Sequence, residues 1–275
     1  MEQARRIRKR FTSDGFVFPL DAMTPARAGE YRQAFTALEE RIETSGIGRG
    51  GQINHVHTVL RFVNEIVRND RMLDAVEALI GPDILVWDCT FIIKEARSSG
   101  FVSWHQDLRY WGLEDVNKVV SAWLALGPVS RANGCMQFVR GSHRQGLAEH
   151  RDEYAAENIL SRGQVAQVNV SEDDVVHAEL QAGQFSLHHG LLVHSSPANL
   201  SDDRRWGLVT NFVAAGNRQV VAPPDLAMPV RGEDPYGHFG HLPVPEADLC
   251  SEALGWHGRV VAARQWAQYA AEGRA

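Results

Sequence analysis

The spacing of apolar residues changes once along the chain. Over residues 24–44, behind a Thr-Pro pair, apolar side chains recur every three or four positions from Tyr31 to Ile42. This spacing predicts an amphipathic helix. A second helix is expected over residues 58–80, where apolar positions again fall on one side and Gly-Pro-Asp ends the pattern. The glycine-rich stretch SGIGRGGQINH between them is expected to be a loop.

From residue 84 the pattern becomes that of short strands. Segments such as ILVWDCTFIIK, VVSAWLALGP and CMQFVRGSH are dense in β-branched and aromatic residues and end at Gly, Pro, Asn or Asp turns. Many short strands in this arrangement favour a double-stranded β-helix, or jelly roll, with flanking helices. Residues 144–162 interrupt the series with a polar, partly helical insertion.

One domain is expected for the whole chain. Its length of 275 residues and its 44% hydrophobic composition suffice for a substantial core. Within this domain we expect an irregular, proline-rich surface arm over residues 221–248, and a terminal helix follows over residues 252–272. The predicted parts are therefore a helical N-terminal part, 1–82, a jelly-roll core, 83–220, and a C-terminal arm and helix, 221–275.

Charge and cysteine content narrow the class of protein. The chain has 28 basic and 34 acidic residues, a formal charge of −6, and no clustered basic stripe, so nucleic acid is an unfavourable partner. No run approaches eighteen apolar residues, and TSDGFVF follows the basic first residues where a signal peptide needs an apolar stretch. Cys89, Cys135 and Cys250 are few and widely spaced, which favours reduced thiols. We expect a cytoplasmic protein without membrane partners, and the sequence does not indicate its oligomeric state.

Residues 104–111, WHQDLRYW, hold the first candidate chemistry. Side chains two apart on a strand project to the same side, so His105 and Asp107 could point into one cavity. An imidazole and a carboxylate are two members of the 2-His-1-carboxylate facial triad of non-heme iron. The pair is weak on its own, because a polar interruption of an apolar strand would look the same, and a third ligand is needed.

Candidates for the third ligand lie in GQFSLHHGLLVHSSPANLSDDRRWGLV. His188, His189 and His194 compete, and Arg205 follows His194 by eleven residues. If His194 ends one strand and Arg205 begins its neighbour, a guanidinium lies just beyond the metal, where its planar fork suits a distal carboxylate. Arg204 is the rival cation, and the eleven-residue spacing favours Arg205.

Taken together, these segments resemble the phytanoyl-CoA dioxygenase family of Fe(II)- and 2-oxoglutarate-dependent oxygenases. The resemblance extends over TSDGFVFPLDAMT, WHQD with YWGL, VSAWLAL, NGCMQFVRGSH and GQFSLHHGLLVHSSPAN with DDRR. These motifs cover roughly two-thirds of the chain in the family's order. No single one is decisive, whereas their joint order is specific.

The resemblance implies a ligand set and cofactors. His105, Asp107 and His194 would bind Fe(II), and the cosubstrates would be 2-oxoglutarate and O2. Arg205 would hold the C5 carboxylate of 2-oxoglutarate, with Ser196 as a second donor, while Trp123 would line the cosubstrate pocket or, alternatively, pack in the core. No catalytic residue beyond the metal ligands is needed. Family members with Ala or Gly in place of the carboxylate are halogenases, so Asp107 implies hydroxylation.

The substrate is a small molecule whose identity the sequence leaves open. An aromatic wall from Tyr110 and Trp111 would suit a quaternary ammonium group or a flat apolar substrate, although the same residues could anchor a loop. The candidates for binding the substrate are Tyr110, Trp111, Arg109, Arg140, His57 and Asn54. The motif wording is similar to the bacterial organophosphonate hydroxylase branch, which implies 2-aminoethylphosphonate or its N-trimethyl form.

Three alternatives stay open at this point. One is a tailoring hydroxylase of a secondary metabolite. Another is a non-oxidative, cupin-like metal-binding protein, which would favour a histidine-rich ligand set and give Arg205 no cosubstrate to hold. The third is an inactive binding protein, against which the complete set of His105, Asp107 and His194 argues.

Overall fold

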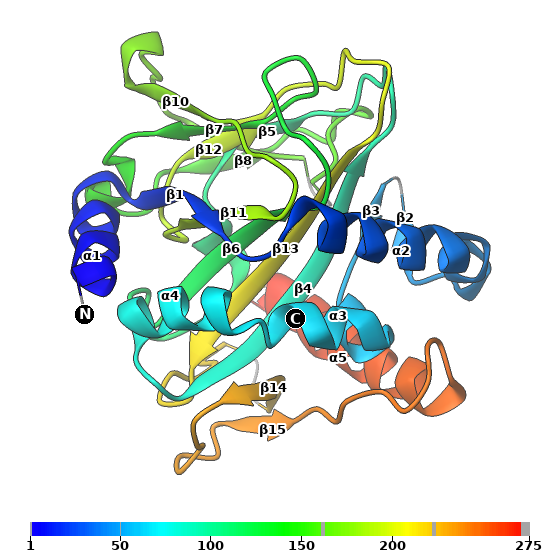
Figure 1. Ribbon diagram of the computed structural model, residues 1–275. Helices are drawn as coiled ribbons and strands as arrows, with labels where there is room; N and C mark the ends of the chain where they lie inside the picture. Colours follow the sequence, from blue (N-terminus) through cyan, green and yellow to red (C-terminus); the bar gives the residue numbers. More distant parts are fainter. Residues whose placement is uncertain (1, 50, 161–162, 222–223, 271–275) are drawn as a thin grey trace.

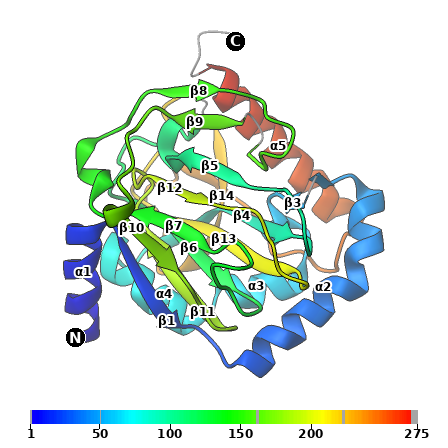
Figure 2. The same cartoon turned by 90° about the horizontal axis from the view of Figure 1, so that it is seen from above.

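Two β-sheets face each other across the middle of the molecule in the computed structural model (Figure 1). The structure describes residues 2–49, 51–160, 163–221 and 224–270. Figure 2, a view from above, shows the smaller sheet lying over the larger one. This arrangement, with its flanking helices, is the predicted jelly roll, and the prediction of fold class is confirmed.

The larger sheet runs in the order β1-β11-β6-β13-β4-β14-β15. In addition, β3 pairs with β4, and β2 pairs with β3. Its neighbours are antiparallel except for β14 and β15. The central strands β4, β6 and β13 are buried along most of their length, because helices cover one face and the second sheet covers the other. The bounds are β1 Phe16–Asp21, β2 Gly48–Arg49, β3 Gln52–Ile53, β4 Ile84–Lys94, β6 Val119–Ala125, β11 Gln184–His188, β13 Arg205–Ala214, β14 Asp225–Arg231 and β15 Phe239–His241.

The smaller sheet has four short strands in the order β10-β7-β12-β5. A separate two-stranded pair, β8 with β9, flanks it. Short strands that alternate with turns reflect the frequent Gly and Asn breaks in this part of the sequence. The bounds are β5 Val102–His105, β7 Met136–Val139, β8 His150–Asp152, β9 Gln164–Ala166, β10 Val175–Ala178 and β12 His194–Ser196.

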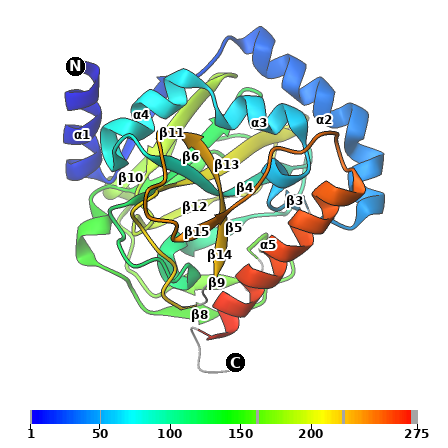
Figure 3. The same cartoon turned by 90° about the horizontal axis from the view of Figure 1, so that it is seen from below.

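Helices cover the outer face of the larger sheet. Figure 3, seen from below, shows α3 and α4 across that face and α5 running beside β14. The main apolar core lies between this face and the helices, with Phe35, Phe91 and Phe212 among its fully buried members. The bounds are α1 Glu2–Asp14, α2 Pro25–Ser45, α3 Arg61–Val67, α4 Asp70–Ile80 and α5 Ser251–Ala270.

The helix predicted over residues 24–44 is confirmed as α2, and Thr24 caps it by accepting a hydrogen bond from the Arg27 amide. The single helix predicted over residues 58–80 is wrong, because the chain breaks between α3 and α4. The cause is Asn69, whose side chain accepts a hydrogen bond from the Met72 amide and so begins a new helix.

Two further predictions need correction. The segment 144–162 contains no α-helix in its described residues; it holds the end of a 3-10 turn and β8, which pairs with β9. The supposed irregular arm at 221–248 includes β14, which extends the larger sheet, and β15. A proline within β14 is tolerated because the pairing register shifts next to Pro229.

The C-terminal helix is confirmed as α5. The three cysteines are free thiols, and Cys89 and Cys135 are buried. Among the described helices, none combines the length and apolar character that a membrane crossing requires.

Candidate active site

Three ligand atoms from two strands and one turn converge between the sheets. His105, Asp107 and His194 each offer one ligand atom, and these three atoms all lie within 4.8 Å of one another. His105 and His194 are directly opposed in the β5–β12 pair, and their rings lie 4.1 Å apart between centroids. The Oδ1 atom of Asp107 lies 3.4 Å from His105 Nε2 and 3.6 Å from His194 Nε2. The structure therefore brings the three predicted ligands together.

The route by which Asp107 joins the histidines differs from the prediction. His105 is the last residue of β5, and Asp107 begins a 3-10 turn, Asp107–Tyr110, so the two do not share a strand. Gln106 between them keeps an extended backbone, and its side-chain amide donates to the carbonyls of Gly146 and Leu191. This anchoring holds the turn against the strand, so that a carboxylate outside the strand still faces the two imidazoles.

Backbone carbonyls fix the tautomers of both histidines. His105 Nδ1 lies 2.9 Å from the Ser103 carbonyl oxygen, and His194 Nδ1 lies 2.9 Å from that of Leu192. A carbonyl only accepts, so each Nδ1 carries the proton and each Nε2 presents a lone pair. Burial also lowers the pKa of His194 to about 3, which keeps its ring neutral. Two neutral imidazoles and one carboxylate are the donor set that Fe(II) takes in a facial triad.

The second oxygen of Asp107 is held from the larger sheet. Ser121 Oγ donates to Asp107 Oδ2 at 2.9 Å, and His188 Nε2 lies 3.3 Å from the same oxygen. Burial opposes ionisation of Asp107, but His194, His105 and His188 lower its pKa well below the usual value. The carboxylate is thus ionised, with Oδ1 facing the imidazoles and Oδ2 anchored.

A buried cationic corner lies beside this centre. Arg205 and Lys94 are each 1% exposed and stand opposite one another in the β4–β13 pair. Lys94 Nζ donates to Ser196 Oγ at 2.7 Å and to two backbone carbonyls, whereas Arg205 Nε has no partner among the described residues. Neither side chain has an acidic partner in the described structure. Burial lowers the pKa of Lys94 to about 6 and that of Arg205 to about 10, so Arg205 supplies the positive charge of this corner. A buried guanidinium with an orphaned N–H fits an anionic ligand such as the carboxylate of 2-oxoglutarate.

Packing orients the arginine in this corner. The Arg205 guanidinium lies over the Trp123 ring, 5.2 Å from its centroid. Trp123 in turn covers Gly207, where an added Cβ would lie 2.2 Å from the ring. Contrary to the expectation of neighbouring strands, Arg205 and His194 belong to opposite sheets, which places the cationic corner across the cavity from the metal ligands.

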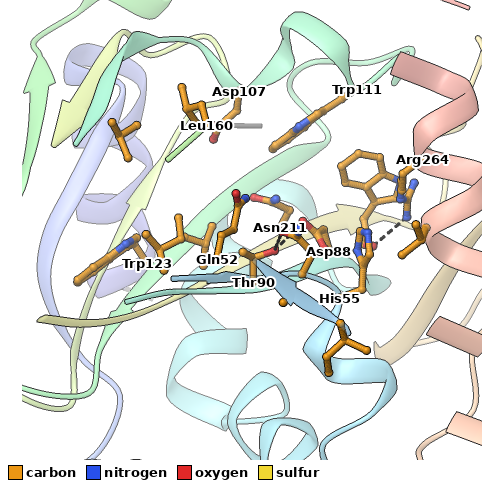
Figure 4. A pocket seen from close by; sticks show the side chains of 18 of the residues that line it. Gln52, His55, Asp88, Thr90, Asp107, Trp111, Trp123, Leu160, Asn211 and Arg264 are labelled. Atoms are coloured by element: carbon orange, nitrogen blue, oxygen red, sulfur yellow. Dashed lines mark hydrogen bonds and ion pairs between the residues drawn. The ribbon is translucent and has the colours of Figure 1, made fainter. Parts of the chain in front are cut away.

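One cavity of about 890 Å³ joins these groups to a second, distal end (Figure 4). The proximal end contains the three predicted metal ligands together with Trp123, Ser196 and Arg205. The distal end lies between β4, β13 and one side of α5. The distal lining consists of Gln52, Asn54, His55, Trp87, Asp88, Thr90, Trp111, Asn211, Leu254, His257, Gly258, Val261, Arg264 and Gln265.

The predicted substrate residues do not all reach the cavity. Trp111 and Asn54 line it, whereas Arg109 and Arg140 do not. Arg140 pairs with Asp14 near α1 at 2.8 Å. His57 is fully buried and does not line the cavity, and neither of its ring nitrogens has a hydrogen-bond partner in the described part of the chain. The side chain of Tyr110 lies outside the described residues.

Arg204, the rival of Arg205, turns outward and pairs with Glu39 and Glu95. None of the described residues of the stretch 221–248 lines the cavity, whereas residues of α5 do.

Several site residues were missed from the sequence. Ser121 could have been found, because it lies two positions from Trp123 on the same strand face. Lys94 reaches the site only through its register opposite Arg205, which the sequence does not show. His188 was weighed as a metal ligand and takes a different place, beside the Asp107 carboxylate. Asp88, Asn211 and the α5 residues carry no local signal.

Comparison with known proteins agrees with this geometry. The family model for phytanoyl-CoA dioxygenase (PhyH) matches residues 11–207. The peroxisomal phytanoyl-CoA dioxygenase of Bos taurus is 30% identical over 151 residues, which cover 52% of this chain and 44% of that protein. Phytanoyl-CoA dioxygenase domain-containing protein 1 of Bos taurus is 26% identical over 166 residues, 60% of this chain and 57% of that protein. The chain thus spans about half the length of these curated relatives.

Solved structures extend the likeness over nearly the whole chain. The apo structure of the non-heme monooxygenase ThoJ has a TM-score of 0.87 and 32% identity, and it covers 98% of this chain and 100% of ThoJ. CytC3 with Fe(II) and alpha-ketoglutarate has a TM-score of 0.64 at 16% identity, with 88% of this chain and 96% of CytC3 covered. The second likeness shows a shared fold.

Proposed function

This chain belongs to the phytanoyl-CoA dioxygenase family of non-heme iron, 2-oxoglutarate-dependent oxygenases, and on that premise we propose that it hydroxylates a C–H bond of a small organic molecule. One observation carries the proposal. Two neutral Nε2 atoms and an anchored carboxylate converge across a cavity from a buried arginine that lacks an acidic partner. A cupin-like metal-binding protein without a cosubstrate would leave that buried charge uncompensated.

Each residue has a defined task in this proposal. His105, Asp107 and His194 would hold Fe(II), and the iron with 2-oxoglutarate would supply the oxidising chemistry. Arg205 would bind the distal carboxylate of 2-oxoglutarate through its unpaired Nε–H, and the Ser196 hydroxyl, already fixed by Lys94, would donate to the same group. Trp123 keeps the guanidinium in place, and the facing sheets exclude bulk water.

The test uses anaerobic protein with Fe(II) and 2-oxoglutarate. A weak visible charge-transfer band is expected, and succinate should form once O2 and a substrate are admitted. His194→Ala should abolish both, whereas His189→Ala, which changes a neighbouring histidine outside the cavity lining, should retain them. A wild type with neither band nor succinate, or a His194→Ala variant that keeps both, would show the assignment to be wrong.

For the substrate, our first candidate is an aminoalkylphosphonate such as 2-aminoethylphosphonate or its N-trimethyl form. Trp111 and the ionised Asp88 at the distal end support an amino or ammonium group. Arg109 and Arg140, expected to meet the phosphonate, lie outside the lining. Substrate-dependent succinate formation with these two phosphonates decides whether this candidate stands.

A larger secondary metabolite is the second candidate, and the size of the cavity favours it. A volume of about 890 Å³ lies near the upper end of the range for pockets that enclose drug-sized ligands. Aminoethylphosphonate would occupy little of that space. A screen that also contains amino acids, betaines and larger amines, scored by succinate release, distinguishes the two candidates.

A further inference from the structure

A row of polar side chains crosses the larger sheet, and two of its three members line the cavity. Ser121, Asn211 and Asp88 occupy matching register positions on β6, β13 and β4, which are neighbouring strands. Strands in a sheet are about 4.8 Å apart, so the row spans about 10 Å. Ser121 at one end of the row donates to the metal-ligating Asp107. The row therefore leads from the predicted metal centre, through Asn211, to Asp88 at the distal end.

Asn211 offers the cavity a buried amide oxygen. It is 6% exposed, it lines the cavity, and its Oδ1 atom accepts no hydrogen bond from the described residues. Figure 4 shows its side chain within the cavity beside Asp88. A buried amide oxygen without a donor is unfavourable, so the arrangement favours a donor supplied by a ligand.

Asp88 retains one oxygen for a ligand. Its Oδ1 atom accepts from the Cys89 amide at 2.8 Å and lies 2.6 Å from His55 Nδ1. Among the described residues, Oδ2 has only the Thr90 hydroxyl, at 3.3 Å. The side chain keeps 18% of its surface exposed, and it lines the cavity. Burial alone would raise the pKa of Asp88, but the neighbouring His55 lowers it below the ordinary value. The distal end therefore presents an ionised acceptor.

The arginine at this end already has an acidic partner. The Arg264 guanidinium is ion-paired with Asp225 and packed 3.7 Å over the Trp87 ring. Beside it, Trp87 and Trp111 lie 5.1 Å apart between ring centroids and give the wall an aromatic surface. Arg264 Nε has no partner among the described residues, so this end also holds one unpaired donor. Asp88 Oδ1 is paired with His55, whereas Asp88 Oδ2 and Asn211 Oδ1 are acceptors that remain for a ligand next to the aromatic faces.

We propose that Asp88 and Asn211 form the substrate-recognition subsite of the cavity and that they bind a protonated amine. Its N–H groups donate to Asp88 Oδ2 and Asn211 Oδ1. A hydroxyl group fits less well, because it has no positive charge to pair with Asp88. A trimethylammonium group also fits less well, because it has no N–H to donate to Asn211. The subsite deepens the proposed function, on which its role in catalysis rests, but amine binding itself requires neither iron nor 2-oxoglutarate.

Calorimetric titration of the metal-free protein with three probes of one carbon skeleton tests this assignment. The probes are 2-phenylethylamine, its N,N,N-trimethyl derivative and 2-phenylethanol. In the wild type, the amine should bind at least tenfold more tightly than the other two. Asp88→Asn and Asn211→Leu should each remove that preference, while Asp202→Asn, an 81% exposed acid, should keep it. Thermal unfolding of each variant establishes that it is folded.

Equal binding of the amine and the alcohol, equal binding of the amine and its trimethyl form, or no binding of the amine would each overturn the subsite. So would a folded Asp88→Asn protein that keeps the preference. Failure of the proposed function has a different signature, because amine binding would then persist without the charge-transfer band or succinate. Conversely, succinate formation without amine preference removes the subsite and leaves the oxygenase.

Discussion

At the scale of single residues, the Asp107 carboxylate shows how the fold prepares a metal ligand. Its Oδ1 atom faces the two imidazoles, and its Oδ2 atom is held by Ser121 and His188 from the opposite sheet. Partners of this kind restrict the rotation of a carboxylate before any metal binds, so less ordering is needed on binding. His188 is therefore a positioning residue, although it stands within reach of the metal ligands.

Replacement of His188 tests this positioning role. His188→Ala should weaken binding of Mn²⁺, used as a redox-stable substitute for Fe(II), by about 10–100-fold, the usual effect of losing a hydrogen-bond partner of a metal ligand. Calorimetric titration measures the affinity. His189→Ala is the matched control, since that ring packs against Phe11 and His143 and should leave the affinity unchanged. Equal Mn²⁺ affinity in wild type and His188→Ala would refute the role.

The same scale shows which site residues a sequence can reveal. His105 and Asp107 stand out because two possible metal ligands lie two positions apart, and His194 stands out because Arg205 follows it by eleven residues. Asp88 and Asn211 are separated by more than a hundred residues and acquire meaning only through the register of β4 against β13. Register depends on pairing across the whole sheet, which no local pattern specifies.

At the scale of elements, α5 depends on one buried arginine. Arg264 is ion-paired with Asp225 and donates to the carbonyls of Trp87 and Leu226, so it joins α5 to β4 and β14. This contact holds one wall of the distal cavity. The helix lies beyond residues 11–207, the part that matches the family model. The wall formed by α5 is thus a natural place for specificity that differs between relatives.

Removal of Arg264 should lower the free energy of unfolding. Arg264→Met leaves Asp225, which is 2% exposed, without its cation, and loss of one partner of a buried pair destabilises by about 3–5 kcal/mol. Urea denaturation measures the loss. Arg259→Met, an exposed arginine on the same helix, should cost far less, and Asp225→Asn in the Arg264→Met background should recover part of the loss. Equal stability of the two arginine variants would show that the pair does not anchor α5.

The elements also show why sequence prediction succeeded in some places and failed in others. The α2 helix combines regular apolar spacing with a capping Thr24, so two local signals agree. The break between α3 and α4 was missed because apolar periodicity continues across Asn69, and a cap is hard to recognise within an unbroken pattern. Strand β14 was missed because proline-rich composition suggests a loop, whereas pairing with β4 is a tertiary effect.

At the scale of the whole molecule, the layered fold requires several histidines to be buried. A jelly roll with helices on one face has two interiors, the sheet–sheet space and the sheet–helix space. His57 and His189 are both largely removed from water, and burial lowers their pKa values to about 3 and about 4. Composition indicated a sizeable core, but which histidines enter it follows from the complete packing.

These buried histidines set the direction of the pH dependence. Well above pH 6.5 an imidazole is neutral in both the folded and the unfolded chain, so His57 does not change the free energy of unfolding there. As the pH falls from 6.5 towards 3, the unfolded chain binds protons that folded His57 refuses, and the free energy of unfolding must decrease. His57→Leu should therefore flatten this decline in urea titrations between pH 7 and 4, whereas His238→Leu at an exposed site should not. An unchanged slope in His57→Leu would mean that His57 is protonated, or accessible to protons, in the folded protein.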